Sequence, residues 1–299
     1  MSTLTTTERR ALARISTNPG GMLIVAADQR NSMKAVMNAP DGPSSISIDE
    51  LRAAKADLVR FLANRGPAIL LDPEVALPHV VDDGVLARDT ALVVGMDASG
   101  FETVDGLRFT RLVDRVTART VRDFAGDAAK MLYYLRPDRQ DLESRVAEEM
   151  RELIRACEDE GVLVIIEILT YRLPEESEEE YARVFPQLIA DSAAFSIACG
   201  AKVLKLPYPG SAEACDAVTA AAQGAPWAVL SAGVDHETFI EQVRIAVEHG
   251  ASGAMAGRSL WKDSLAVTAE DRETLLTGRA APRLHELAEV IDAALAARN

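Results

Sequence analysis

The chain has 299 residues, of which 48% are hydrophobic and 26% are charged, and its formal net charge is −14. This composition excludes a disordered or fibrous chain, and the length suits a single α/β barrel. The negative charge would repel the phosphates of nucleic acid. No apolar run approaches the roughly 20 residues that span a bilayer. We therefore expect neither nucleic acid nor a membrane as a partner.

The N-terminal segment MSTLTTTERRALARIS is polar and lacks the apolar core of a signal sequence, so a cytoplasmic protein is predicted. The three cysteines have no C-x-x-C spacing, which argues against a disulfide framework and against a zinc ribbon.

Short apolar runs recur along the chain and lack the polar alternation of a half-exposed sheet. Runs of this kind are typical of parallel strands covered on both faces. The predicted strands are Met22–Ala27, Ala68–Leu71, Ala91–Val94, Lys130–Leu135, Val162–Ile168, Ala201–Leu206, Trp227–Ser231 and Ser252–Ala256.

The segments between these runs show helical periodicity. In Ser144–Glu160 and Phe239–His249 the apolar residues fall on one helical face. Gly161, Gly200 and Gly250 follow predicted helices, where a C-cap glycine is common. Pro40–Ser47 is predicted to be a loop, and the chain is predicted to end in a helix over Pro282–Asn299.

Eight strand–helix units favour a closed (β/α)₈ TIM barrel over an open sheet. No dinucleotide-binding glycine fingerprint follows the first strand, which disfavours a Rossmann fold. No linker or change of composition marks a second domain, so residues 1–299 are predicted to form one barrel domain. Barrels of this kind often form homo-oligomers, and the sequence does not fix the oligomeric state.

Three ionisable residues interrupt predicted core strands: Lys130, Glu167 and Lys205. Buried charges are costly without partners, so these side chains are expected to converge near the C-terminal ends of the strands. A lysine in a dry site beside a second cation has a lowered pKa, which frees its amine to attack a carbonyl. A nearby carboxylate could then transfer protons. The alternative is a purely structural ion-pair triad. Lys202 is expected at the bottom face or on the surface.

Polar and glycine residues follow the last two predicted strands: Ser231, Gly233, Gly257 and Arg258. Phosphate sites in α/β barrels often form at these two loops, from backbone N–H groups and a cation. Asp28 and Gln29, which follow the first strand, are candidates for binding substrate hydroxyl groups. The alternative role for Asp28 is to cap the first helix after that strand.

The four histidines are scattered, and none shows the spacing of metal ligands, so no metal site is predicted. Cys199 is predicted to be a buried residue of no chemical role, because nothing beside it would activate a thiol.

The chain resembles the class I aldolase family that includes tagatose-1,6-bisphosphate aldolase and sulfofructosephosphate aldolase. The most specific stretch is PWAVLSAGVDHETFIEQVRIAVEHGASGAMAGRSLWKD over Pro226–Asp263, and LIVAADQRNSMK over Leu23–Lys34 is also similar. The tail APRLHELAEVIDA is closer to the sulfofructosephosphate branch. EILTY over Glu167–Tyr171 and KMLYY over Lys130–Tyr134 are closer to the tagatose-bisphosphate branch.

The resemblance implies a metal-independent enzyme that cleaves a ketose phosphate to dihydroxyacetone phosphate and an aldehyde. It assigns the Schiff base to Lys205, acid–base catalysis to Glu167 and an assisting role to Lys130. It also assigns substrate-hydroxyl contacts to Asp28 and Gln29. Anion binding falls on the residues after the last two strands: Ser231, Gly233, Gly257 and Arg258.

The chain departs from the family after the Schiff-base lysine, where Val-Glu-x-Pro is usual and this sequence has Leu206-Pro207-Tyr208-Pro209. This change bears on substrate specificity, and Tyr208 is hypothesised to line a different pocket. Arg30, Lys34 and Arg172 are candidates to bind a second anionic group. Two other functions stay open: a phosphosugar isomerase or epimerase with Glu167 as base, and a non-catalytic sugar-phosphate binding protein.

Overall fold

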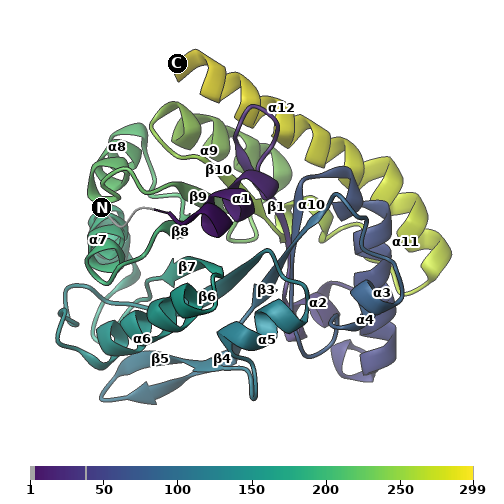
Figure 1. The fold of residues 1–299 in the computed structure, drawn as a ribbon, viewed down its shortest axis with the longest axis horizontal. Coiled ribbons are helices and arrows are strands. Elements are labelled where there is room, and N and C mark those ends of the chain that lie inside the picture. The colour runs from purple at the N-terminus through teal and green to yellow at the C-terminus, as the bar shows by residue number, and fades with distance from the viewer. Residues whose placement is uncertain (1–3, 38, 299) are drawn as a thin grey trace.

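In the computed structural model, which describes residues 4–37 and 39–298, eight parallel strands close into a barrel (Figure 1). Around the barrel the order is β1, β2, β3, β6, β7, β8, β9 and β10, with β10 paired to β1. The predicted (β/α)₈ barrel is thereby confirmed. The barrel strands are β1 Met22–Ala27, β2 Ala68–Leu71, β3 Ala91–Gly95, β6 Ala128–Tyr134, β7 Leu163–Leu169, β8 Val203–Pro207, β9 Trp227–Leu230 and β10 Gly253–Ala256.

Helices between the strands form the outer layer, and the chain ends in the long helix α12 (yellow in Figure 1). Two 3₁₀ turns (Pro43–Ser45 and Ala63–Arg65) and a π-helical turn (Leu276–Ala280) complete the helical structure. The α-helices are α1 Thr6–Arg14, α2 Asn31–Val36, α3 Ile48–Phe61, α4 His79–Asp82, α5 Ala118–Asp123, α6 Arg145–Asp159, α7 Glu178–Ala198, α8 Ala212–Ala221, α9 His236–Glu248, α10 Arg258–Trp261, α11 Ala269–Leu275 and α12 Ala281–Arg298.

The helices predicted from periodicity are confirmed within a few residues. Gly161 and Gly200 follow α6 and α7 with φ of 68° and 101°, the left-handed conformation of a C-cap glycine. The predicted loop before α3 contains the short 3₁₀ turn. The predicted final helix is α12, and the last residue of that prediction, 299, lies outside the described residues.

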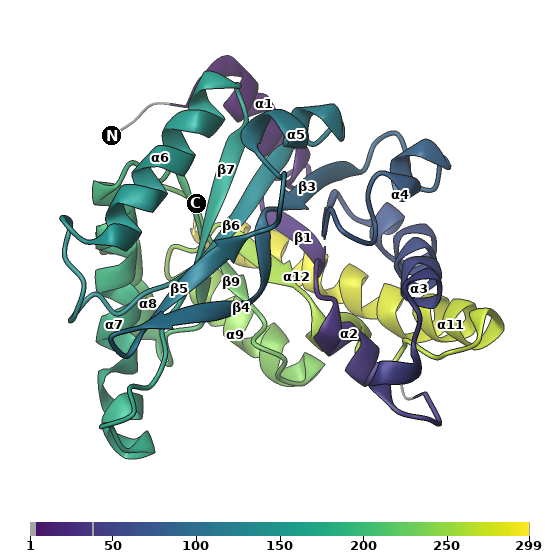
Figure 2. The ribbon, with the colours of Figure 1, turned by 90° about the horizontal axis from the view of Figure 1, so that it is seen from below.

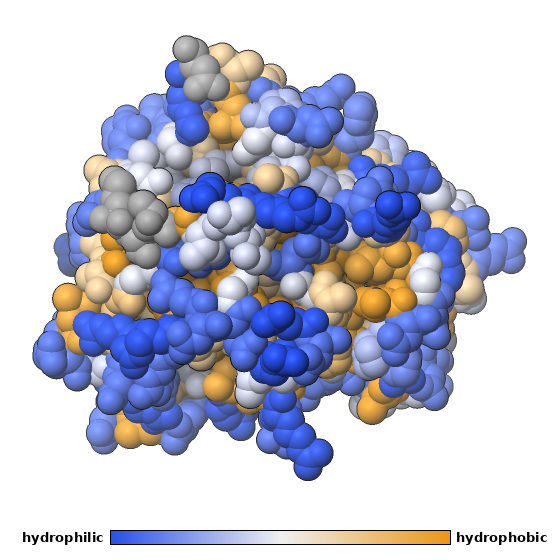
Figure 3. Space-filling model, viewed as in Figure 1, coloured by the Kyte–Doolittle hydropathy of each residue, from blue (hydrophilic) through white to orange (hydrophobic). Residues whose placement is uncertain are grey.

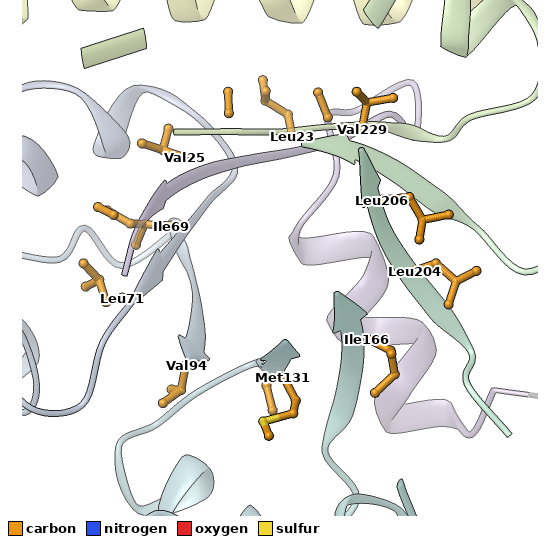
Figure 4. Close-up of a cluster of buried hydrophobic side chains, with 14 of the residues drawn as sticks. Leu23, Val25, Ile69, Leu71, Val94, Met131, Ile166, Leu204, Leu206 and Val229 are labelled. Carbon is orange, nitrogen blue, oxygen red and sulfur yellow. The ribbon is translucent and has the colours of Figure 1, made fainter. Parts of the chain in front are cut away.

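Alternate strand residues face the barrel interior and the helices, because side chains on a strand point to opposite faces with a period of two. Figure 4 shows the outward set, for example Leu23, Ile69 and Leu204, which points away from the ring of strands and packs in the larger core cluster. The inward set, for example Ile24 and Ile165, forms a second cluster inside the barrel. Both faces are therefore buried, as the continuous apolar runs predicted.

The N-terminal helix α1 closes one end of the barrel. Its residues Ala11 and Ile15 join the interior cluster, and buried Glu8 pairs with Lys202 Nζ at 2.7 Å. Lys202 also pairs with Glu158 at 2.8 Å. Figure 2 shows α1 at the upper end of the barrel. Lys202 is thus at the bottom face, as expected, but it is buried there.

The structure adds a feature that the sequence analysis missed, an antiparallel hairpin of β4 Asp97–Val104 and β5 Leu107–Leu112 between β3 and α5. Figure 2 shows it at the end of the barrel away from α1. Its turn is Asp105-Gly106, with φ of 51° and 78°. An Asp-Gly pair with two positive φ angles is typical of a two-residue hairpin turn, so the signal was present in the sequence.

The face seen in Figure 3 is mostly hydrophilic, and its apolar side chains lie in separate patches. Among the described residues, no helix has the length and apolar character needed to cross a bilayer. Cys157, Cys199 and Cys215 are free and buried.

Candidate active site

The charged cluster is positioned by strand alternation. On β6, β7 and β8 the inward positions are apolar near the strand starts, and the next inward positions are Lys130, Glu167 and Lys205. Glu167 and Lys205 are direct register partners on neighbouring strands. On β1, Asp28 continues the inward series that includes Ile24. The cluster therefore sits on top of the apolar interior, toward the C-terminal ends of the strands.

The four side chains are in direct contact. Lys130 Nζ lies 2.7 Å from Asp28 Oδ2 and 3.1 Å from Glu167 Oε2. Lys205 Nζ lies 2.9 Å from the same Glu167 oxygen. Asp97, the first residue of β4, adds a third carboxylate at 2.7 Å from Lys130 Nζ and also accepts a hydrogen bond from the Leu132 N–H. Two cations and three carboxylates thus share one buried site.

These contacts fix the charges in the cluster. Burial opposes the charge on Lys130, but the carboxylates of Asp28, Asp97 and Glu167 outweigh it and raise the pKa of Lys130 well above its usual value. Burial alone would raise the pKa of Glu167, and the ammonium groups of Lys130 and Lys205 lower it instead. The pKa of Asp28 is lowered for the same reason. Lys130 therefore stays an ammonium, because three carboxylates surround it.

A second buried ion pair supports this cluster from the side of α3. Lys55 and Asp72, both fully buried, pair with each other. Lys55 Nζ also donates a hydrogen bond to the Gln29 carbonyl at 2.8 Å. Lys55 therefore holds the backbone that carries Asp28 and Gln29 in place.

The alternative role of Asp28 as a helix cap is wrong. The N-cap residue of α2 is Arg30, and no side chain caps that helix. The Asp28 carboxylate turns instead toward Lys130. Its other oxygen, Oδ1, and the Gln29 Oε1 atom are buried with no hydrogen-bond partner among the described residues. Both atoms are therefore available to accept hydrogen bonds from a substrate.

A pocket of about 360 Å³ opens at the C-terminal ends of β7 to β10. Glu167 and Lys205 line it together with Gln29 and with the predicted anion-binding residues Ser231, Gly233, Gly257 and Arg258. A larger cavity of about 650 Å³ lies by α6, α7 and the start of β8, at the opposite end of β8 from Lys205. The pocket of about 360 Å³ contains Glu167 of β7 and Lys205 of β8, so it is the candidate for the active site.

The anion-binding part of this pocket is built from two loops. Gly233 has φ of 84°, and a side chain there would lie 3.2 Å from the Arg258 guanidinium, so glycine allows the close approach. The Gly257 N–H points to Ser231 Oγ at 3.4 Å, and Lys262 Nζ donates to the Gly233 carbonyl at 3.0 Å. Among the described residues, Arg258 forms no ion pair with a carboxylate. A cation beside backbone N–H groups suits a phosphate.

Comparison with known proteins identifies the family of the chain. A model of the DeoC/LacD family aldolases matches residues 22–263. The chain belongs to this aldolase family. Aldolases are carbon–carbon lyases, so the predicted family and enzyme class are confirmed.

Curated relatives of the aldolase include tagatose 1,6-diphosphate aldolases. The protein of Lactococcus lactis subsp. lactis is 27% identical over 293 residues, which cover 88% of this chain and 87% of the relative. Tagatose 1,6-diphosphate aldolase 2 of Enterococcus faecalis is 28% identical over 302 residues, with 92% and 89% covered.

Solved structures share the fold of the aldolase. A Schiff-base-forming fructose-1,6-bisphosphate aldolase superposes with a TM-score of 0.66 at 16% identity, covering 94% of this chain and 98% of that one. The fructose-bisphosphate aldolase of Slackia heliotrinireducens gives a TM-score of 0.66 at 17% identity, with 100% and 94% covered.

The departure after Lys205 changes the wall of the pocket and leaves the lysine in place. Pro207 is the next inward residue on β8 and lines the pocket. Tyr208 packs against the outer hydrophobic core of the aldolase and is not among the lining residues of the pocket. The hypothesis that Tyr208 lines a different pocket stays a prediction.

The sequence analysis missed two charged residues of this region, Asp97 and Lys55. Asp97 lies just beyond the apolar run of β3, as Asp28 lies just beyond the apolar run of β1. The signal that singled out Asp28 could therefore also have found Asp97. Lys55 lies among buried residues of α3, such as Leu51 and Ala54, where a charge requires a partner. Within the described residues, no group of three or more histidine, cysteine or acidic side chains is arranged to hold a metal ion.

Proposed function

We propose that the aldolase is a class I, metal-independent enzyme that uses Lys205 to form a Schiff base with a ketose 1-phosphate. The observation that carries this proposal is the pair of Lys205 Nζ and Glu167 Oε2, 2.9 Å apart in a pocket that also contains an anion site. An amine nucleophile beside a proton-transfer group is what imine chemistry requires. We propose that residues 1–299 act as a single barrel domain.

The substrate phosphate is proposed to bind at Gly233, Gly257 and Arg258. This anchor would hold the C2 carbonyl against Lys205, so that the free energy of phosphate binding serves to orient the carbonyl for attack. Asp28 and Gln29 would accept hydrogen bonds from substrate hydroxyl groups through the atoms that have no partner among the described residues.

The reaction would proceed in three steps. Glu167 takes a proton from the Lys205 ammonium, and the neutral amine attacks C2. Glu167 then returns the proton to the carbinolamine hydroxyl, which leaves as water and gives a protonated imine. Glu167, which is ionised because its pKa is lowered, takes the proton of the C4 hydroxyl. The C3–C4 bond then breaks, its electron pair moves into the imine as an enamine, and the aldehyde leaves. Protonation of the enamine and hydrolysis release dihydroxyacetone phosphate and return Lys205.

Lys130 is proposed to act as a permanently charged group in this cycle. Its raised pKa keeps it an ammonium, so it can stabilise the Glu167 carboxylate and donate hydrogen bonds to substrate oxygens.

The substrate is proposed to carry a second anion at C6, either in a tagatose or fructose 1,6-bisphosphate or in 6-deoxy-6-sulfofructose 1-phosphate. The names of the curated relatives favour the tagatose bisphosphate. The sulfonate branch, and with it a role in sulfoglycolysis, rests on the similarity of the C-terminal segment. The proposed compartment is the cytoplasm, where free cysteines such as the three found here persist.

The test is imine trapping. The aldolase is incubated with dihydroxyacetone phosphate in the presence of a chelator, reduced with borohydride, and mapped by peptide mass spectrometry. An adduct on the peptide that contains Lys205 is expected. No adduct, or an adduct on another lysine, would overturn the proposal and favour an isomerase or epimerase that uses Glu167 as base, or a binding protein without turnover.

A further inference from the structure

The β4–β5 hairpin rises from the wall of the barrel that faces the anion site. It is inserted between β3 and β6, and in the closed order of eight strands β6 lies opposite β10 and β3 lies opposite β9. The anion site follows β9 and β10. A substrate anchored there, with its carbonyl at Lys205 on β8, therefore extends its far end toward the hairpin.

The hairpin carries an arginine held between two aromatic rings. The guanidinium carbon of Arg108 lies 4.4 Å from the ring centre of Phe101 and 4.6 Å from that of Tyr171. The backbone N–H of Arg108 donates a hydrogen bond to the Tyr171 hydroxyl at 2.9 Å. Tyr134 completes the cluster, with its ring 5.1 Å from Phe101 and 6.3 Å from Tyr171.

This aromatic cluster is connected to the pocket through neighbouring residues on β6 and after β7. Tyr134 is an inward residue of β6, two inward steps above Lys130, and its register partner is Leu169. Leu169 lines the pocket, as does Thr170, whose hydroxyl contacts the Tyr181 hydroxyl at 2.7 Å. The residue after Thr170 is Tyr171, the ring that holds Arg108. The rings that surround Arg108 therefore directly adjoin residues of the pocket wall.

The stacking leaves the hydrogen-bonding edge of Arg108 open. Its guanidinium carbon lies over the rings of Phe101 and Tyr171. A guanidinium stacked on a ring keeps its N–H groups free to donate hydrogen bonds in its own plane. Across residues 4–37 and 39–298, no carboxylate lies within ion-pair distance of this side chain, and its guanidinium forms no hydrogen bond. In a chain with a net charge of −14, an ordered cation without an acidic partner is suited to bind an anionic ligand.

The three cations that the sequence suggested for a second anion are engaged elsewhere. Arg30 pairs with Glu74 and donates to the Asp97 carbonyl at 3.0 Å. Lys34 Nζ donates to the Ile46 carbonyl at 2.6 Å, and Arg172 donates to the Glu176 carbonyl at 2.5 Å.

We propose that Arg108 binds the second anionic group of the substrate, at the end remote from the C1 phosphate, and so makes the aldolase selective for ketose phosphates with two anionic ends. This inference rests on the proposed function of the site. The planar, preorganised fork of Arg108 matches two oxygens of a phosphate or a sulfonate.

The experiment compares substrates with and without the second anion. The kcat/KM of wild-type and Arg108→Met enzyme is measured with one doubly anionic substrate and with the singly anionic fructose 1-phosphate. The doubly anionic substrate is whichever the wild type cleaves among tagatose 1,6-bisphosphate, fructose 1,6-bisphosphate and 6-deoxy-6-sulfofructose 1-phosphate. Methionine keeps an apolar stem between the rings and removes the charge. We expect kcat/KM to fall about 10- to 100-fold for the doubly anionic substrate and less than about 3-fold for fructose 1-phosphate.

Two further variants serve as controls. Arg108→Lys should recover part of the lost kcat/KM, because it restores the charge without the planar fork. Arg111→Ala, which removes an exposed arginine of the same strand whose guanidinium donates to the Ser99 carbonyl, should match the wild type with both substrates.

The outcomes separate the inference from the proposed function. Borohydride trapping of dihydroxyacetone phosphate should be unchanged in Arg108→Met. Wild-type protein that forms no adduct overturns both proposals. If the adduct forms, the inference alone is overturned by equal losses on both substrates, by no loss on the doubly anionic substrate, or by a wild type that turns over no doubly anionic substrate.

Discussion

Replacing Lys130 with methionine tests how the buried cluster is held together. The substitution keeps the length of the side chain and removes the cation that contacts Asp28, Asp97 and Glu167. Removing one partner of a buried ion pair typically costs about 3–5 kcal/mol. In the variant, Glu167 can bind a proton, and this limits the loss in the free energy of unfolding. With an ordinary pKa of 4.5, this protonation costs about 3 kcal/mol at pH 7. We therefore expect the free energy of unfolding to fall by about 3 kcal/mol at pH 7.

The stability difference between the wild type and Lys130→Met should depend on pH, in a direction that follows from the pKa shifts of the carboxylates. In the wild type, the lowered pKa values of Asp28 and Glu167 contribute stability that is present above their unfolded pKa values and is lost as the pH falls through the folded ones. In the variant, Glu167 binds a proton on folding, so the cost decreases as the pH falls toward 4.5. The stability difference should shrink by about 1.4 kcal/mol per pH unit, to about half its pH 7 value near pH 6.

The assay is urea unfolding of both proteins at pH 7, 6 and 5.5, together with kcat for a ketose bisphosphate. We expect kcat to fall about 10²- to 10⁴-fold, because Lys130 would no longer stabilise the Glu167 carboxylate. Lys202→Met is the matched control, since it also removes a buried lysine with two carboxylate partners, at the other end of the barrel. It should lower stability and leave kcat unchanged. A destabilisation of Lys130→Met that does not vary with pH would refute the electrostatic reasoning.

Three further variants test the pocket. Lys205→Ala should lose turnover and the trapped adduct while its far-UV circular dichroism stays native; near-normal cleavage would remove Lys205 from its role. Arg258→Ala should raise KM for a ketose bisphosphate about 10- to 100-fold in steady-state kinetics, because the phosphate loses its cation, and an unchanged KM would exclude Arg258 from the site. Gly233→Ala should cost about 1 kcal/mol in urea unfolding, because φ is 84°, and should also raise KM, since the new methyl group would contact the Arg258 guanidinium. Gly20→Ala has similar backbone strain in open space, so it should lose stability without a change in KM; a rise in KM there would contradict the steric explanation.

The sequence by itself determined the barrel. Parallel strands covered on both faces require continuous apolar runs, and such runs, spaced by helical segments, located all eight strands of the barrel within a few residues. It also singled out Lys130, Glu167 and Lys205, because a charge within a core strand needs a partner wherever the fold places it.

Only the tertiary structure decided which groups meet. Asp97 and Lys55 contact the site through residues that are distant in the chain, and no local pattern specifies such a pairing. Whether Asp28 caps a helix or faces Lys130 depends on its inward position on β1, which the closure of the barrel sets. The pKa of Lys130 is raised because three carboxylates from distant parts of the chain converge on it. The place of Arg108 opposite the anion site follows from the order of strands around the barrel, which is a property of the closed ring and not of any one segment.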